Sequence, residues 1–126
     1  MLPADSRVRR SAEFGDVVRR GRRCGRPAVV VHFLATDADT GPRAGVVVGR
    51  AVGGAVVRNR VRRRIRAQLA ELLPSVPSGT LLVIRALPAS ASSSYQEIGT
   101  QITSALRKLD EHRKLDEHRK LEGHRV

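Results

Sequence analysis

Six arginines fall within nine positions, from Arg58 to Arg66, in the stretch VVRNRVRRRIRAQL (residues 56–69). Guanidinium groups bind phosphates through forked N–H donors and also stack on bases. The segment from Arg50 to Gln68 contains no acidic residue, so the neighbouring sequence offers these cations no partner. The spacing therefore predicts a surface for a polyanion, with nucleic acid as the first candidate and an anionic membrane as the second.

Residue types that carry catalysis are scattered. The serines and histidines show no spacing typical of a nucleophile and its base. Asp37 and Asp39 form the only acidic pair near the basic half, in a turn-rich stretch where loop formation explains them. Cys24 is the only cysteine, which excludes an intrachain disulfide and a cysteine-built zinc site. We expect a protein that binds nucleic acid and has no catalytic or metal-binding residues of its own.

The positive charge is unevenly placed along the chain. Lys and Arg total 24 against 12 acidic residues, a formal charge of +12. Residues 1–66 hold 16 arginines and five acids, a net of +11, whereas residues 67–126 carry a net of +1. All three lysines lie near the C-terminus, and the arginine preference elsewhere fits phosphate binding or codon bias in a GC-rich genome. The polyanion should meet surfaces made by the first half.

The length of 126 residues predicts one domain with one modest core. The N-terminus has no apolar run typical of a signal peptide, and no apolar run is long enough to span a bilayer. We therefore expect a cytoplasmic protein, with no membrane and no obligate protein partner.

The elements that must position the arginines are predicted as a small α+β two-layer sandwich, α-β-β-(β)-α-β-α, with helices packed on one sheet. The optional strand is expected around residues 36–44. The other expected elements are helices at 11–21, 55–73 and from 95 onward, and strands at 28–34, 43–49 and 80–86.

The arginine stretch is amphipathic when it is placed on a helix. Its sheet-facing side comprises Val57, Val61, Ile65, Gln68, Leu69 and Leu72. The opposite side comprises Asn59, Arg60, Arg63 and Arg66, with Arg62 and Arg64 at the two borders. Arg58 falls in the apolar sector, so it should point into the groove between helix and sheet.

Three other interpretations of this helix were weighed. An ordinary solvated face normally interleaves acids with bases. A membrane-surface helix would carry tryptophan or other large anchors. A DNA-reading helix needs side chains that discriminate bases, whereas an arginine face suits phosphate positioning. RNA or DNA phosphate remains the favoured partner.

The C-terminal region repeats KLDEHR at 108–113 and 114–119, followed by KLEGHR at 120–125. The histidines of successive repeats lack the i,i+4 spacing of a helical metal site. We divide the chain into a basic flexible arm (1–10), one RNA-binding domain (11–109), and a charged repeat tail (110–126) that is a frayed helix or disordered.

The segment RAGVVVGRAVGGAVVRNRVRRRIRAQL (residues 43–69) resembles the signature region of the bacterial ribonuclease P protein family. RRSAEFGDVVRRGRR (9–23) resembles the family's first helix, and LLVIRALPAS (81–90) its last strand. The resemblance covers residues 7–107. Ala51 and Gly54 replace a commonly basic residue and a commonly Asn residue, and Val18 stands where relatives often carry an aromatic.

The resemblance implies a left-handed βαβ crossover, an exception to the usual right-handed rule. It also implies a protein subunit without catalytic residues, because the family's catalyst is a magnesium-dependent RNA subunit. That enzyme is an endonuclease that removes the 5′ leader of precursor tRNA. The implied partners are therefore ribonuclease P RNA and precursor tRNA, with Mg²⁺ held together with the RNA.

The resemblance also implies the site residues. The RNA-docking positions are Arg50, Arg58, Asn59, Arg60, Arg62, Arg63 and Arg66. The leader-cleft positions are Phe14, Val30 and His32, of which Phe14 and Val30 could equally be core residues, whereas polar His32 on a sheet face is expected to be exposed. Two alternatives stay open: a structural RNA-binding protein of ribosomal or chaperone type, and a self-sufficient nuclease.

Overall fold

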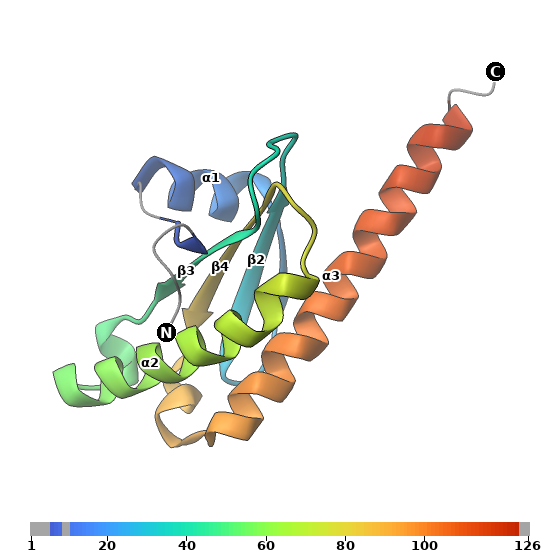
Figure 1. The fold of residues 1–126 in the computed structure, drawn as a ribbon. Helices are drawn as coiled ribbons and strands as arrows, with labels where there is room; N and C mark the ends of the chain where they lie inside the picture. The colour runs from blue at the N-terminus through green and yellow to red at the C-terminus, as the bar shows by residue number, and fades with distance from the viewer. Residues whose placement is uncertain (1–5, 9–10, 124–126) are drawn as a thin grey trace.

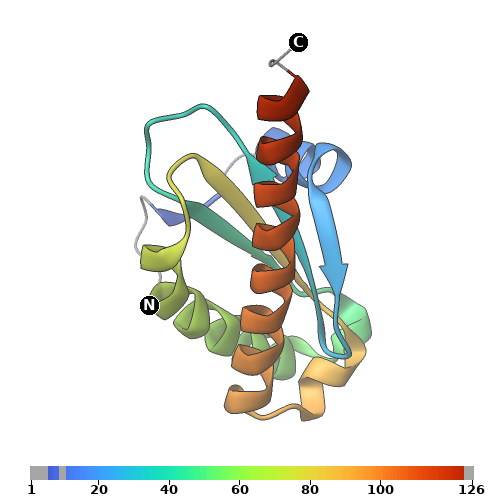
Figure 2. The same ribbon diagram turned by 90° about the vertical axis from the view of Figure 1, so that its right-hand side faces the viewer.

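The computed structural model describes residues 6–8 and 11–123. Four strands form one mixed sheet in the order β1-β2-β4-β3, with α2 and α3 on one face and α1 on the other (Figures 1 and 2). The predicted α+β sandwich is confirmed. The helices are α1 (Ser11–Arg20), α2 (Ala55–Leu72) and α3 (Tyr95–Gly123), and the strands are β1 (Arg22–Gly25), β2 (Val29–Ala35), β3 (Arg43–Val47) and β4 (Thr80–Ala86). Short 3-10 helices are η2 (Arg50–Val52), η3 (Leu73–Ser75) and η4 (Pro88–Ser92).

The main core lies between the sheet and the α2–α3 layer. Side chains alternate along a strand, so Val29, Val31 and Phe33 of β2 share the face turned toward these helices. The apolar stripe predicted for the arginine helix meets them, and its members Val61 and Ile65 are fully buried. Each such side chain contributes about 1.5–3 kcal/mol on burial. This contact fixes the orientation of α2 and hence the direction in which its arginines point.

The fourth strand lies elsewhere than expected. Residues 36–42 form a loop, and the additional strand is β1, which pairs antiparallel with β2 at the sheet edge. Its sequence RRCG lacks an apolar alternation because only Cys24 faces the core. The expected position at 36–44 was therefore wrong, because β1 is held by backbone pairing rather than by a side-chain pattern.

The α2 helix connects two neighbouring parallel strands, β3 and β4. In Figure 1 both strands point downward, β4 lies to the right of β3, and α2 crosses in front of them. This arrangement is the left-handed crossover that the resemblance implied. It places the start of α2 beside the ends of β3 and β4.

The N-terminal end of the described chain contacts the sheet, whereas the last turns of α3 project beyond it (Figure 1). Arg7 bridges to Ala44 of β3, and Val8 is buried, so this part of the predicted arm is docked; residues 1–5 and 9–10 lie outside the described residues. The α3 helix continues through the repeats as far as Gly123. Within the described part of the chain, no helix is long and apolar enough to cross a membrane.

Candidate nucleic-acid interface

The α2 helix begins at an unusual turn. Gly53 has φ 155°, and a β-carbon there would lie 3.0 Å from the side chain of Val57, so glycine is required. Gly54 is the N-cap and supplies no side-chain hydrogen bond, and the first turn has no acidic residue. The N–H groups and positive dipole end of α2 therefore add to the charge of its arginines.

The polar residues of α2 form three stripes around the apolar one. Arg58, Arg62 and Arg66 follow one another at i,i+4 on one flank of the core stripe. Arg58 is half-buried with its Nε fully buried, and no acceptor among the described residues reaches that atom. Burial, followed by the neighbouring charges of Arg7 and Arg62, lowers the pKa of Arg66. These guanidinium groups are crowded, and an added anion would relieve their repulsion.

A second stripe is engaged within the protein. Arg60 donates a hydrogen bond to the Ala91 carbonyl at 3.1 Å, and Arg64 donates to the Ser93 carbonyl at 3.0 Å. The helical wheel placed Arg60 on the outward side, and this placement was wrong, because the η4 region supplies carbonyl acceptors next to the helix. Arg60 remains half-buried, so one part of its guanidinium is committed to the fold.

The third stripe faces solvent, although Arg66, which the helical wheel also placed on this outward side, is half-buried on the flank beside Arg62. Asn59 and Arg63 are exposed, and the Asn59 side-chain oxygen accepts a hydrogen bond of 3.0 Å from Arg62. Arg50, in η2 before the helix, is exposed as well. We call the set Arg50, Arg58, Asn59, Arg60, Arg62, Arg63 and Arg66 the α2 arginine surface.

The three predicted cleft residues lie on the other face of the sheet, together with α1. Phe14 of α1 packs over Gly45 of β3, where a β-carbon would come within 2.5 Å of the ring. Val30 is 9% exposed and His32 only 2%, so the expected exposure of His32 was wrong. The reason is that α1 packs directly across β2 and β4, which a strand pattern does not reveal.

His32 is an unusual buried group. Neither ring nitrogen has a hydrogen-bond partner among the described residues. Burial, followed by the charges of Arg85 and Arg23, lowers the pKa of His32. A neutral imidazole is therefore favoured below α1, flanked by two cations.

Two residues on this face were not singled out by the sequence. Arg85 of β4 pairs with Val30 on one side and Val47 on the other, so all three point to the same face. Arg85 is exposed, and Val47 is 39% exposed, at the end of the sheet that α1 leaves uncovered. The signal was available, because Arg85 is the one charge in an otherwise apolar strand. Arg7 was also missed, since its position beside Arg66 depends on a bridge to distant β3.

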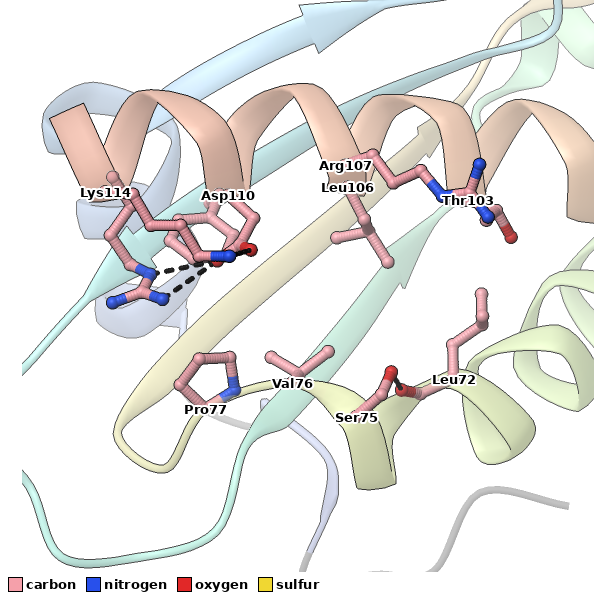
Figure 3. A pocket seen from close by; sticks show the side chains of 11 residues that line it. Leu72, Ser75, Val76, Pro77, Thr103, Leu106, Arg107, Asp110 and Lys114 are labelled. Atoms are coloured by element: carbon pink, nitrogen blue, oxygen red, sulfur yellow. Dashed lines mark hydrogen bonds and ion pairs between the residues drawn. The ribbon is translucent and has the colours of Figure 1, made fainter.

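A cavity of about 410 Å³ lies on the opposite side, between α3 and the turn after α2 (Figure 3). Its apolar floor includes Leu72, Val76 and Leu106. Among the charges that line it, Arg113 and Lys114 pair with Asp110, and Arg107 is a further cation. The cavity lies on the core face of the sheet, away from the face that carries Arg85. We assign it no part in binding nucleic acid.

The family model described as Ribonuclease P matches residues 2–110. A ribonuclease P protein component from Streptomyces griseus is 45% identical over 117 residues, covering 86% of this chain and 95% of that protein. One from Rhodococcus opacus is 48% identical over 116 residues, covering 87% and 93%. Among solved structures, the Staphylococcus aureus RNase P protein matches with TM-score 0.70 at 21% identity (81% of this chain, 93% of that one). The Thermotoga maritima RNase P protein gives 0.67 at 22% (82% and 94%).

Proposed function

The chain belongs to the ribonuclease P protein family, and from this premise we propose that it docks on the catalytic RNA and holds the 5′ leader of precursor tRNA. As a ribonuclease P protein component it is a subunit of a tRNA-processing ribonucleoprotein. The observation that carries the proposal is the acid-free α2 arginine surface on this fold. The proposed place of action is the cytoplasm.

Docking is proposed to work through phosphate neutralisation. Asn59 and Arg63 face outward, and Arg62 and Arg66 lie beside them on the flank. Each guanidinium that replaces condensed counterions on RNA releases them, so binding should weaken steeply as salt increases. Burial, followed by the charges of Arg7 and Arg62, lowers the pKa of Arg66, and a bound phosphate would offset the contribution of those charges.

The leader is proposed to lie on the sheet face beside α1. Phe14 is half-buried at one side, and exposed Val47 and Arg85 make the uncovered end of the face, next to buried Val30. His32 supports this face from beneath α1 rather than touching solvent. Because aromatic residues amount to 2% of the chain, we propose that leader binding uses shape and phosphate contacts more than base stacking.

Magnesium is proposed to act with the RNA. Among the described residues, no group of three or more His, Cys, Asp or Glu side chains lies together as a metal site would require. The donor set of this described part of the chain does not fit a bound Mg²⁺, and we derive no step through one. The protein's contribution in this proposal is to neutralise phosphates, which lowers the concentration of Mg²⁺ that the RNA needs.

Cleavage of precursor tRNA at low Mg²⁺ tests the proposal. A bacterial ribonuclease P RNA alone, this protein alone, and the two together would be compared. Stimulation only in the mixture, with a lower Mg²⁺ midpoint, is expected. Cleavage by the protein alone would mean that it is a nuclease in its own right.

Leader length separates the proposal from a structural RNA-binding role. With the RNA subunit present, the holoenzyme should bind precursor tRNA more tightly than mature tRNA. Equal binding of both, without stimulation by cognate or related RNA subunits, would favour a general RNA-binding protein.

A further inference from the structure

A second dense group of arginines lies where α1 ends and β1 begins. Arg19, Arg20, Arg22 and Arg23 occupy four of five consecutive positions, and all four are exposed. We call them the corner arginines. The strands β1 and β3 form the two opposite edges of the sheet. Arg7 and the β3–α2–β4 crossover lie at the β3 side, so the corner arginines at β1 are a separate patch of positive charge.

The corner is compensated only in part. Asp16 reaches Arg19 at 3.4 Å from one turn earlier in α1. Arg22 forms an ion pair with Asp116, which is 94 residues away in the repeat tail. Within the described residues, Arg20 and Arg23 have no ion pair.

The contact with the tail is open to solvent. A cavity of about 520 Å³ separates α3 from the corner, and its charged lining comprises Arg20, Arg22, Asp37, Arg113, Asp116 and Glu117. The side chains of Arg22 and Asp116 are 50% and 38% exposed. Exposed ion pairs of this kind are weak and are screened by salt, so a polyanion can replace the carboxylate.

A carboxylate and a phosphate offer arginine the same kind of charged oxygen acceptor. We propose that the corner arginines are a second contact surface for RNA phosphates, and that Asp116 of the tail occupies Arg22 until RNA displaces it. The tail thereby lowers the affinity of the protein for RNA. This proposal rests on the proposed function, because it takes the partner to be RNA.

The tail lies beyond the region that defines the family. The family match ends at residue 110, and Asp116 belongs to the second KLDEHR repeat. The competition is thus a property of this chain's own C-terminal repeats, added to a domain that is otherwise that of its relatives.

The test compares two variants with the same change in charge. Asp116→Asn removes the carboxylate that meets Arg22, and Glu111→Gln removes an exposed carboxylate of α3 that forms no ion pair among the described residues. Affinity is measured for ribonuclease P RNA with the whole protein, and for precursor tRNA with the reconstituted holoenzyme. Asp116→Asn should tighten binding about two- to fivefold in at least one of these two affinity measurements, the range expected for one exposed ion pair. Glu111→Gln should leave it unchanged.

A background of Arg22→Ala completes the test. There, Asp116→Asn should have no effect, because its partner is gone. Equal tightening by Asp116→Asn and Glu111→Gln would overturn the proposal in favour of a general field effect. A lower melting temperature for Asp116→Asn without any change in affinity would also overturn it, by showing a purely structural pair.

The affinity and cleavage measurements also distinguish a failure of this proposal from a failure of the proposed function. If the wild-type protein stimulates cleavage but Asp116→Asn leaves both affinities unchanged, only the tail proposal fails. If the wild-type protein neither binds the RNA nor stimulates cleavage, both fail.

Discussion

The arginine helix and the repeat tail are both rich in charged residues, but the charges follow opposite patterns. Between Arg50 and Gln68 there is no acidic residue, whereas acidic and basic residues alternate through the repeats of α3. In the tail, Arg113 contacts Asp110 at 2.9 Å and Glu117 at 2.8 Å, and Lys114 contacts Asp110 at 3.3 Å. The pattern of charge, rather than its amount, decides whether a helix needs an external partner.

The pKa shifts follow the same division. The hydrogen bond to Asp110, against the effect of partial burial, raises the pKa of Arg113. Burial and the charges of Arg7 and Arg62 lower the pKa of Arg66. The guanidinium of Arg113 is stabilised within its own helix, whereas burial and neighbouring cations disfavour the charge of Arg66, which in our proposal RNA phosphate offsets.

Charge reversal should give the largest contrast between the two helices. Arg63→Glu places a carboxylate on the exposed stripe of α2 and should weaken binding to ribonuclease P RNA roughly tenfold or more, as for the loss of a charged hydrogen bond. Arg119→Glu makes the same change at an exposed position of the tail and should cost about twofold at most. If a binding titration shows that both variants lose the same RNA affinity, the proposed difference between the two helices is wrong.

Truncation of Arg60 should show that one α2 arginine also serves the fold. Arg60→Ala loses the bond to the Ala91 carbonyl and should lower the free energy of unfolding by about 1 kcal/mol. Arg63→Ala should leave stability unchanged while reducing RNA affinity by roughly 1–2 kcal/mol. Denaturant unfolding of both variants measures the difference, and equal stability would mean that the carbonyl contact contributes nothing.

Acidification should lower the folding stability through His32, whose imidazole lies between two cations. The pKa of His32 is lowered in the folded state by burial, Arg85 and Arg23, so below the ordinary value of 6.5 the unfolded state binds more protons. Stability should therefore fall as pH drops through 6.5 toward the folded pKa. His32→Leu should flatten this dependence in thermal melts, whereas a change at exposed His112 should not. If the pH dependence of stability is unchanged in His32→Leu, groups other than His32 cause it.

Removal of a tail carboxylate should give the smallest effect. Partial burial would raise the pKa of Asp110, but hydrogen bonds from Arg113 and Lys114 prevail and lower it. Its contribution is present above the unfolded pKa of 3.8 and is lost as pH falls through the folded value. Because the side chain is 37% exposed, Asp110→Asn should cost only a few tenths of a kcal/mol at neutral pH. A loss above 1 kcal/mol in chemical denaturation would show that the tail is part of the core domain's stability.

Local patterns predicted much of this molecule. The 3.6-residue spacing of Val61, Ile65 and Leu69 located α2 and its buried side, and short apolar runs located β2 and β4. The partial burial of Arg58 is consistent with the same wheel. These features depend on neighbours within a few residues.

Contacts between distant segments were not predictable in the same way. Arg60 meets a carbonyl 31 residues away, and Arg22 meets a carboxylate 94 residues away. The burial of His32 depends on where α1 packs on the sheet, and the residue pattern of β2 does not predict that position. In each case the partner's identity comes from the tertiary arrangement rather than from the spacing of residue types.

The salt dependence of RNA binding tests most directly whether phosphates compensate the α2 arginines. Equilibrium binding to ribonuclease P RNA would be measured across salt concentrations for the wild-type protein and for Arg62→Ala/Arg63→Ala/Arg66→Ala, with helix content checked by circular dichroism. A plot of log affinity against log salt should be shallower for the variant by roughly two to three, at about 0.7–0.9 per lost phosphate contact. Parallel lines with equal affinity would contradict the central claim, because the arginines of α2 would then be merely solvated.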